Sequence, residues 1–286
     1  MAESYNFSGH ETFHCRPFWL KKGYDYLQSD KNFNAEDAVV HLGVGKNMVT
    51  AIRFWMRAFD MADDSNKLTD LAHHLLDDKG WDPYLEDIGS LWLLHYHLVA
   101  SGHASSARII FNELRDRNPE FDAKTYSEFI LSEKGNFTDK TVEKDFGVFL
   151  RNYHAKAEGE IDDLAGLLAD LELVNTAKVE AEDDTKRKER KIYFIERRKR
   201  PTLPPRILLY AILDSIPDRL SISLTVLMEQ VGRTFALDKE GMFELLSELP
   251  VLYKDNITVS REAGVIELQF KKRPDRWTIL ADHYGN

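Results

Sequence analysis

The sequence lacks several features that define common classes of protein. Cys15 is the only cysteine among 286 residues, which excludes an intrachain disulfide and a cysteine zinc cluster and suits a reducing compartment. The longest apolar stretch, 91–100, is interrupted by two histidines and is too short to span a bilayer. Residues 1–8 lack the apolar core of a signal peptide. We therefore expect a cytoplasmic protein without a membrane segment.

The motifs of common nucleotide-binding and catalytic classes are also missing. The Gly45-Lys46 pair resembles the end of a phosphate-binding loop, but Val40 stands where that loop needs its first glycine and Asn47 where it needs Ser or Thr. The sequence shows neither a dinucleotide-binding fingerprint nor a nucleophile beside a base. We therefore expect no cofactor and no enzymatic activity.

A net positive charge is missing as well, since the formal charge is -10. Affinity for nucleic-acid phosphate depends largely on Lys and Arg, so this value argues against indiscriminate DNA binding. The charge is uneven, however. Residues 186–200 contain nine Lys or Arg and two Glu, so this basic segment carries +7 and the remainder of the chain -17. Such a segment on an acidic protein favours local contact with a polyanion.

Hydrophobic residues make up 43% of the chain and aromatic residues 11%, as in a packed globular protein. Its length suggests two or three domains. Apolar residues recur mostly at helical spacing, and short β-patterned segments follow the helices twice along the chain. Asp122 and Thr138 are expected to cap helices, and an acidic helix is expected over 161–171. Strands are expected over 171–176, 191–197 and 277–280. We predict a mainly α fold with short β-hairpins, built of tandem winged-helix or helix-turn-helix units. The predicted domains are 1–104, 105–200 and 201–286.

The most specific pattern is a predicted helix-turn-helix over 34–59. Asn34 is expected to cap a first helix that ends at Leu42, and two glycines form the turn. In the second helix, apolar residues recur on one face and polar or basic residues on another. The second helix of such a pair enters the DNA major groove. The residues predicted to contact DNA are Lys46, Asn47, Thr50, Arg53 and Arg57. A plain helix pair with a solvated basic face is the alternative.

The basic segment is predicted to lie on the hairpin, or wing, of the second domain. Aromatic and branched residues at its centre suit a strand, and its cations suit contact with DNA phosphates. Its predicted DNA-contacting residues are Lys186, Arg187, Lys188, Arg190, Lys191, Arg197, Arg198, Lys199 and Arg200. An exposed strand edge protected by charges is the alternative interpretation.

The string His10-Glu11-Thr12-Phe13-His14 matches the HExxH motif of zinc peptidases. That chemistry requires both histidines on one helix seated under a sheet, but few residues precede the string and Pro17 follows it closely. We expect no metal here. Residues 7–18 are instead predicted to form a polar segment that fixes the N-terminus onto the first domain.

Two pairs of strings carry a resemblance to a known family. They are FSGHETF (7–13) with RPFWLKKG (16–23), and LGVGKNMV (42–49) with IRFW (52–55). Together they resemble the signature blocks of the bacterial domain-of-unknown-function family numbered 4007, which is similar in extent to nearly the whole chain. In that family the position of His14 is not reliably histidine. Its members accompany genes for DNA sulfur modification (phosphorothioation) and phage defence, which implies a role in such a system but no defined reaction.

The leading hypothesis is a non-enzymatic protein that binds double-stranded DNA within a modification or phage-defence system. The main alternative is a scaffold whose acidic surface docks a partner modification or restriction enzyme. The third is a metal-dependent hydrolase that uses His10, Glu11 and His14.

Overall fold

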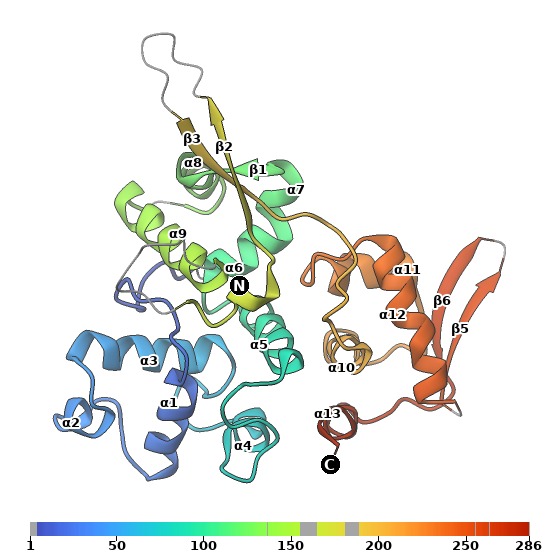
Figure 1. The fold of residues 1–286 in the computed structure, drawn as a ribbon, viewed down its shortest axis with the longest axis horizontal. Coiled ribbons are helices and arrows are strands. Elements are labelled where there is room, and N and C mark those ends of the chain that lie inside the picture. Colours follow the sequence, from blue (N-terminus) through green and yellow to red (C-terminus); the bar gives the residue numbers. More distant parts are fainter. Residues whose placement is uncertain are drawn as a thin grey trace. The chain divides into compact units, whose positions relative to one another are not determined.

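The structure is a computed structural model that describes residues 5–135, 137–154, 165–180, 189–254, 256–262 and 264–285 (Figure 1). The predicted fold class is confirmed at the coarse level, because the chain is mostly helical with small antiparallel sheets. Two compact units are present: unit 1 comprises Met1–Tyr84 and His97–Glu196, and unit 2 comprises Leu85–Tyr96 and Arg197–Asn286. The predicted boundary at 104/105 lies inside unit 1, and the division into three domains stays a prediction.

Unit 1 consists of helices with one small sheet. The bounds of its helices are α1 (Trp19–Gln28), α2 (Ala38–Leu42), α3 (Lys46–Ala58), α4 (Asp70–Leu76), α6 (Ser105–Ile109), the π-helix η1 (Ile110–Leu114), α7 (Arg115–Arg117), α8 (Ala123–Glu133), α9 (Asp139–Tyr153) and the 3-10 helix η2 (Ala169–Leu171). Helix α5 (Ile88–Ser101) contributes residues to both units. The predicted caps of α8 and α9 are confirmed: Asp122 accepts from Thr125 N–H, and Thr138 accepts from Thr141 N–H.

Helix α3 is held by a close crossing with α1. Its residues Val49, Ile52 and Met56 are buried, as their spacing predicts. At the crossing, a Cβ atom added at Gly23 of α1 would lie 2.7 Å from the Met56 sulfur and 3.1 Å from Ile52. Only glycine therefore allows the two helices to approach this closely. The packing fixes one face of α3 and leaves the opposite face to solvent.

Tyr24 of α1 gives a prediction about alkaline stability. Burial raises the pKa of Tyr24 from 10.0 to about 12, and a 3.0 Å hydrogen bond to Asp77 acts in the same direction. The folded state therefore keeps this proton where the unfolded chain releases it, so its contribution is complete below pH 10 and is lost between pH 10 and pH 12. In urea unfolding across this range, Tyr24→Phe should lose stability less steeply than the wild type. Equal slopes would contradict the assignment.

The sheet of unit 1 has the strand order β1-β3-β2, with β1 (Glu120–Phe121), β2 (Asn175–Glu180) and β3 (Glu189–Phe194) all antiparallel. Asn175 pairs with Phe194, and Glu180 pairs with Glu189. The β2–β3 hairpin extends beyond the helices of this unit (Figure 1). Along the chain, a helix, a strand, two helices and two strands thus form one module.

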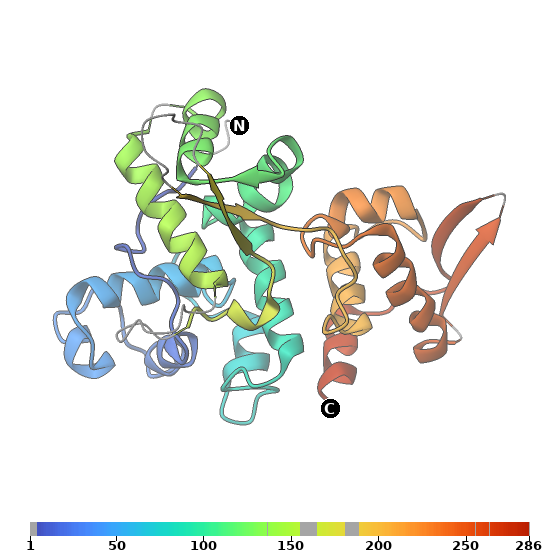
Figure 2. The ribbon, with the colours of Figure 1, turned by 45° about the horizontal axis from the view of Figure 1, so that its top comes forward.

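Unit 2 repeats this order of elements and the same strand order. Its elements are α10 (Pro205–Ser215), β4 (Ser221–Ser223), α11 (Leu224–Leu227) continued by the π-helix η3 (Met228–Gly232), α12 (Lys239–Leu252), β5 (Ile257–Glu262), β6 (Val265–Phe270) and α13 (Arg276–Tyr284). The sheet order is β4-β6-β5. Figure 2 shows the β5–β6 hairpin beside α12.

Some predicted elements are wrong in extent or type. The first helix of the 34–59 segment begins at Ala38, because residues 34–37 form turns. The strands predicted at 171–176 and 191–197 lie at Asn175–Glu180 and Glu189–Phe194 instead. Of the acidic helix predicted at 161–171, the segment 161–164 lies outside the described residues, and only Ala169–Leu171 is helical among the rest.

The strand predicted at Trp277–Leu280 is also wrong, since this segment lies in α13. The Asp275 carboxylate accepts from Trp277 N–H and Thr278 N–H at 3.0 Å each and so caps a helix. Ile279 and Leu280 are buried, and α13 packs against α10. Tertiary packing and the cap thus outweigh the β-propensity of the segment. Among the described residues, the structure has no helix long and apolar enough to cross a membrane.

Candidate nucleic-acid interface

The turn before α3 has the geometry that the two glycines predict. Gly43 closes α2 in a left-handed conformation with φ 62°, where a side chain would add strain. Gly45 is extended and precedes the first residue of α3. Lys46, Asn47 and Thr50 are exposed at the leading end of the helix. The three polar residues predicted to meet DNA first are therefore accessible to solvent.

Lys46, Thr50 and Arg53 line one wall of a groove of about 440 Å³, which we call the Lys46–Arg53 groove. The opposite wall is formed by residues 33–36, 38 and 39 and includes Glu36. Arg53 donates to the Asn34 side-chain oxygen at 2.8 Å, so Asn34 positions this guanidinium rather than capping α2. Arg53 is half-buried, and its partner in this bond is an amide oxygen rather than a carboxylate.

Arg57, one turn further along α3, has a different environment. It donates to the Asp64 carbonyl oxygen at 2.6 Å and to the Asn66 side chain at 3.0 Å. Burial lowers the pKa of Arg57 from its ordinary value, and the charge of Arg53 acts in the same direction. The guanidinium stays charged, since even a lowered arginine pKa lies far above neutrality. It is held by the loop after α3 and is less available to a ligand than Lys46.

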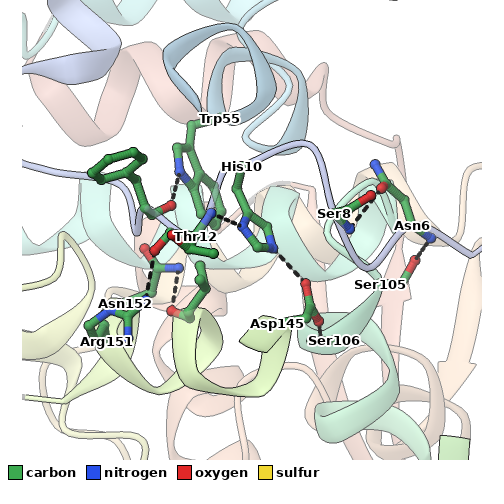
Figure 3. Close-up of polar contacts among 12 residues, drawn as sticks. Asn6, Ser8, His10, Thr12, Trp55, Ser105, Ser106, Asp145, Arg151 and Asn152 are labelled. Carbon is green, nitrogen blue, oxygen red and sulfur yellow. Dashed lines mark hydrogen bonds and ion pairs between the residues drawn. The ribbon is translucent and has the colours of Figure 1, made fainter. Parts of the chain in front are cut away.

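The segment before α1 runs between α3 and α9 and joins them (Figures 1 and 2). From α3, the Trp55 indole N–H donates to the Phe13 carbonyl at 3.0 Å. From α9, Arg151 donates to the Thr12 carbonyl at 2.7 Å, and the Asn152 side chain accepts from Cys15 N–H at 2.9 Å. The contacts of Trp55 and Arg151 are drawn in Figure 3. We call residues 6–15 the N-terminal clamp.

His10 lies at the centre of the clamp and is 3% exposed (Figure 3). Its Nδ1 accepts from Thr12 N–H at 3.2 Å, so its Nε2 carries the proton that it donates to the Asp145 carboxylate at 2.7 Å. The second Asp145 oxygen accepts from the Ser106 hydroxyl of α6, which also contacts the Tyr126 hydroxyl of α8. One buried network thus connects the clamp to three helices.

Burial raises the pKa of the Asp145 carboxyl above its ordinary value, and the hydrogen bond from His10 acts in the opposite direction. Burial also raises the pKa of Tyr126, with the charge of Asp145 as the next cause. A buried carboxylate is costly unless hydrogen bonds and a charged or polar partner surround it. His10, Ser106 and Tyr126 supply those partners.

The HExxH string does not have the geometry of a peptidase site. Residues 10–14 form turns and extended chain rather than a helix, and Glu11 and Thr12 have positive φ values of 50° and 66°. His10 and His14 therefore do not lie one turn apart on a helix. Thr12 and Asp145 bond the two ring nitrogens of His10, and His14 is 3% exposed. The clamp contacts α3, as expected of a segment that fixes the N-terminus onto the first domain. It also contacts α6 and α9.

The clamp also brings the leading ends of α3 and α9 to one cavity of about 380 Å³. Asn47 of α3 lies on one side, and Thr141 and Lys144 of α9 lie on another. The remaining lining residues are those of the clamp segment 7–12, including the exposed hydroxyl of Ser8 and the carboxylate of Glu11. We call it the Asn47–Lys144 cavity. The Asn47 amide, the hydroxyls of Ser8 and Thr141 and the Lys144 ammonium can all donate hydrogen bonds to phosphate oxygens.

Comparison with known families shows to which family the chain belongs. The model of a family described as a protein of unknown function (DUF4007) matches residues 7–284. The chain belongs to the DUF4007 family. The family predicted from the strings over 7–55 is thereby confirmed.

Two solved structures are similar to this DUF4007 member over its whole length. One, described as an SspB crystal structure, has a TM-score of 0.82 and 31% sequence identity and covers 100% of this chain and 89% of that chain. The other, a magnesium ion-bound SspB crystal structure, has a TM-score of 0.81 and 28% identity with the same coverage. No curated protein matches the chain.

The basic segment of this DUF4007 member is divided between the two units at Glu196. Lys186, Arg187 and Lys188 lie outside the described residues. In unit 1, Arg190 is 3.3 Å from Asp122, and the Lys191 ammonium lies 5.4 Å from the centre of the Tyr193 ring. Both side chains are exposed.

The rest of the basic segment belongs to unit 2. Arg197 and Arg198 are exposed. Lys199 binds Glu240 at 2.7 Å and Glu244 at 2.5 Å, and these hydrogen bonds raise its pKa above the ordinary value. Arg200 is only 4% exposed. The predicted DNA contacts of this segment stay predictions, but Lys199 and Arg200 are the least accessible of them.

Sequence reasoning missed Asp145, Thr141 and Lys144 of the DUF4007 member. A signal for Asp145 was present, because it lies in the buried stripe of α9 between Val142 and Phe146. A carboxylate at such a position requires a partner. Nothing local in the sequence indicates that the partner is His10, which is distant in the chain, or that Lys144 approaches Asn47.

Proposed function

We propose that this protein binds double-stranded DNA as a non-enzymatic accessory protein of a bacterial DNA-modification or phage-defence system, acting in the cytoplasm. One observation carries the proposal. The second helices of two helix pairs, α2–α3 and α8–α9, present their N-terminal residues to the same cavity. Those residues are the ones that reach base edges and phosphates in helix-turn-helix proteins. The association of the family with DNA sulfur modification agrees with this assignment.

The order of elements supports the finer assignment of two winged-helix units. In each unit, a helix, a strand, two helices and a hairpin follow in that order, and the first strand pairs with the last. In unit 1 the helix before the hairpin is α9, which carries exposed Lys140, Lys144 and Arg151. We infer that α9 and α3 approach DNA together and that the β2–β3 hairpin contacts its backbone.

The corresponding helix of unit 2 has more acidic than basic residues, whereas α9 has equal numbers of both. The exposed residues of α12 include Glu240, Glu244 and Glu248, and its end carries Val251 at 69% exposure. An acidic surface with an exposed apolar residue suits a partner protein better than DNA. This observation favours the second candidate function, docking of a modification or restriction enzyme, and assigns it to unit 2.

The two functions are separable by experiment. Glu244→Lys with Glu248→Lys should reduce co-purification with the products of neighbouring genes and leave duplex binding equal or stronger. Weaker duplex binding with Lys144→Ala, together with unchanged co-purification, would place the two activities in different units. If both duplex binding and co-purification decreased in both variants, the assignment of the two functions to different units would be contradicted.

Metal-dependent hydrolysis through His10, Glu11 and His14 is not part of the proposal, because both ring nitrogens of His10 are bonded, one to Thr12 and one to Asp145. One of the similar structures holds magnesium. Binding experiments should therefore be done with and without Mg²⁺.

The direct test is the salt dependence of duplex binding, measured by fluorescence anisotropy. Each phosphate contact contributes about 0.9 to the slope of log K against log salt. Lys144→Ala should weaken binding and reduce this slope by about 0.9. Lys271→Ala is the matched control, because Lys271 is also an exposed lysine but lies after β6 in unit 2. An unchanged slope in Lys144→Ala would remove α9 from the interface.

A further inference from the structure

A second pocket in unit 1 has a different composition from the Asn47–Lys144 cavity. It has a volume of about 420 Å³ and lies beside α1 and the end of α2. Its lining residues include Phe18, Tyr84, Lys22 and Lys31. This volume is within the range of small-ligand pockets. We call it the Phe18–Tyr84 pocket.

Phe18 has an unfavourable backbone conformation and an exposed ring. Its φ is 67° and its ψ is -5°, in the left-handed region that glycine and asparagine adopt most readily. It precedes α1 without forming a side-chain cap, and its side chain is 61% exposed. A glycine here would relieve the strain and remove the exposed apolar surface. Phenylalanine at this position therefore brings no evident stability to the fold. Residues with a strained backbone are found most often at binding and active sites.

Tyr84 pairs with Phe18 across the pocket. The ring centres are 6.5 Å apart at an interplanar angle of 70°, and Tyr84 is 58% exposed. Both rings therefore keep most of their surface for a ligand. Aromatic rings exposed in this way stack with nucleobases irrespective of base sequence.

The two exposed lysines of the pocket are held by a carbonyl oxygen and an imidazole nitrogen. Lys22 donates to the Leu42 carbonyl at 2.9 Å, and the Lys31 ammonium lies 3.0 Å from Nδ1 of His41. Asp25 also lines the pocket, but its carboxylate is 2.5 Å from the ammonium of buried Lys21. The Asp37 carboxylate lies 3.1 Å from the other ring nitrogen of His41, but neither lysine bonds a carboxylate in these contacts. Such cations suit a phosphate group.

We propose that the Phe18–Tyr84 pocket binds an unpaired nucleotide of DNA, with the base against the two rings and the phosphate at Lys22 and Lys31. A protein partner would also use exposed aromatic residues, but lysine is depleted from protein–protein interfaces. The combination of rings and lysines is that of proteins that bind single-stranded nucleic acid. This inference rests on the proposed contact with DNA and adds a second DNA-binding site to the interface at α3 and α9.

The test compares fully paired duplexes with duplexes that contain one bulged 2-aminopurine, using the full chain. The wild type should bind the bulged duplex about tenfold more tightly, because stacking of one base supports a preference of this size. Binding should also quench the fluorescence of the bulged base. Phe18→Gly should abolish both effects and leave affinity for the paired duplex unchanged. Phe18→Trp should retain them.

Phe18→Gly is a safe variant for folding, because glycine adopts the left-handed conformation without strain. Its melting temperature should equal or exceed that of the wild type. A wild type without preference for the bulged duplex, or a Phe18→Gly variant that retains it, would overturn the inference. Loss of a co-purified protein with unchanged binding of both duplexes would also overturn it and identify a protein-docking surface.

Failure of the inference is distinguishable from failure of the proposed function. A wild type that binds both duplexes equally, and binds both more weakly with Lys144→Ala, overturns the pocket alone. A wild type that binds the bulged duplex and not the paired one overturns the helix-turn-helix interface and supports the pocket.

Discussion

Changing Lys46 and Lys144 together to glutamate is expected to weaken duplex binding by about 10²-fold at 0.1 M salt. At this concentration, the release of counterions from one phosphate contact contributes roughly tenfold to affinity, so two lost contacts account for this factor. The introduced carboxylates add repulsion. Both side chains are exposed, one at the start of α3 and the other on α9, so the fold should not be disturbed. Anisotropy titration with a labelled duplex measures the change.

The matched control reverses two charges elsewhere. Lys271→Glu with Lys272→Glu changes the net charge by the same amount on exposed residues after β6 of unit 2. If only the overall charge of -10 governs binding, both variants will lose affinity equally. A local interface requires the Lys46 and Lys144 variant to lose far more. Equal losses would thus disprove the assignment of DNA binding to α3 and α9.

Asp145→Ala is expected to have the largest effect on stability, a loss of about 3–5 kcal/mol in the free energy of unfolding. The carboxylate accepts from His10 at 2.7 Å and from the Ser106 hydroxyl, and it is 5% exposed. Its removal leaves two buried donors unpaired and a cavity between the clamp, α6 and α9. Urea unfolding monitored by tryptophan fluorescence measures the loss.

Asp145→Asn is the conservative comparison. It keeps an acceptor oxygen and the volume of the side chain, so it should cost about 1–3 kcal/mol, less than the alanine variant. Ser106→Ala removes one donor and should cost about 1 kcal/mol. If the alanine variant is no less stable than the asparagine variant, the network does not hold the clamp. If the network does hold it, Asp145→Ala should also weaken duplex binding, because the clamp sets α3 against α9.

Most local structure was predictable from the sequence. The apolar spacing of Val49, Ile52 and Met56 gave the buried face of α3, and the glycines at 43 and 45 gave the turn before it. The caps at Asp122 and Thr138 marked the starts of α8 and α9. These features depend on neighbouring residues, whose hydrogen bonds and packing have a fixed spacing along the chain. The family followed from short strings of the same kind.

The failures of prediction arise mostly where distant residues decide. Trp277–Leu280 has the composition of a strand, but packing against α10 makes it helical, and the local cap at Asp275 was overlooked. The strands of the unit 1 hairpin are displaced from their predicted positions because the pairing of Asn175 with Phe194 sets their register. Propensity is a weak guide when burial against another element competes with it.

The sequence by itself determined the family, the mainly helical class and the polar face of α3, because each depends on residues close together in the chain. Only the tertiary structure decided that His10 binds Asp145 and that Lys144 lies at the same cavity as Asn47. It also distinguished the exposed Lys46 from Arg57, which the following loop holds, and from the buried Arg200. Such contacts join segments far apart in sequence, and neither periodicity nor composition encodes which distant partner closes a hydrogen bond.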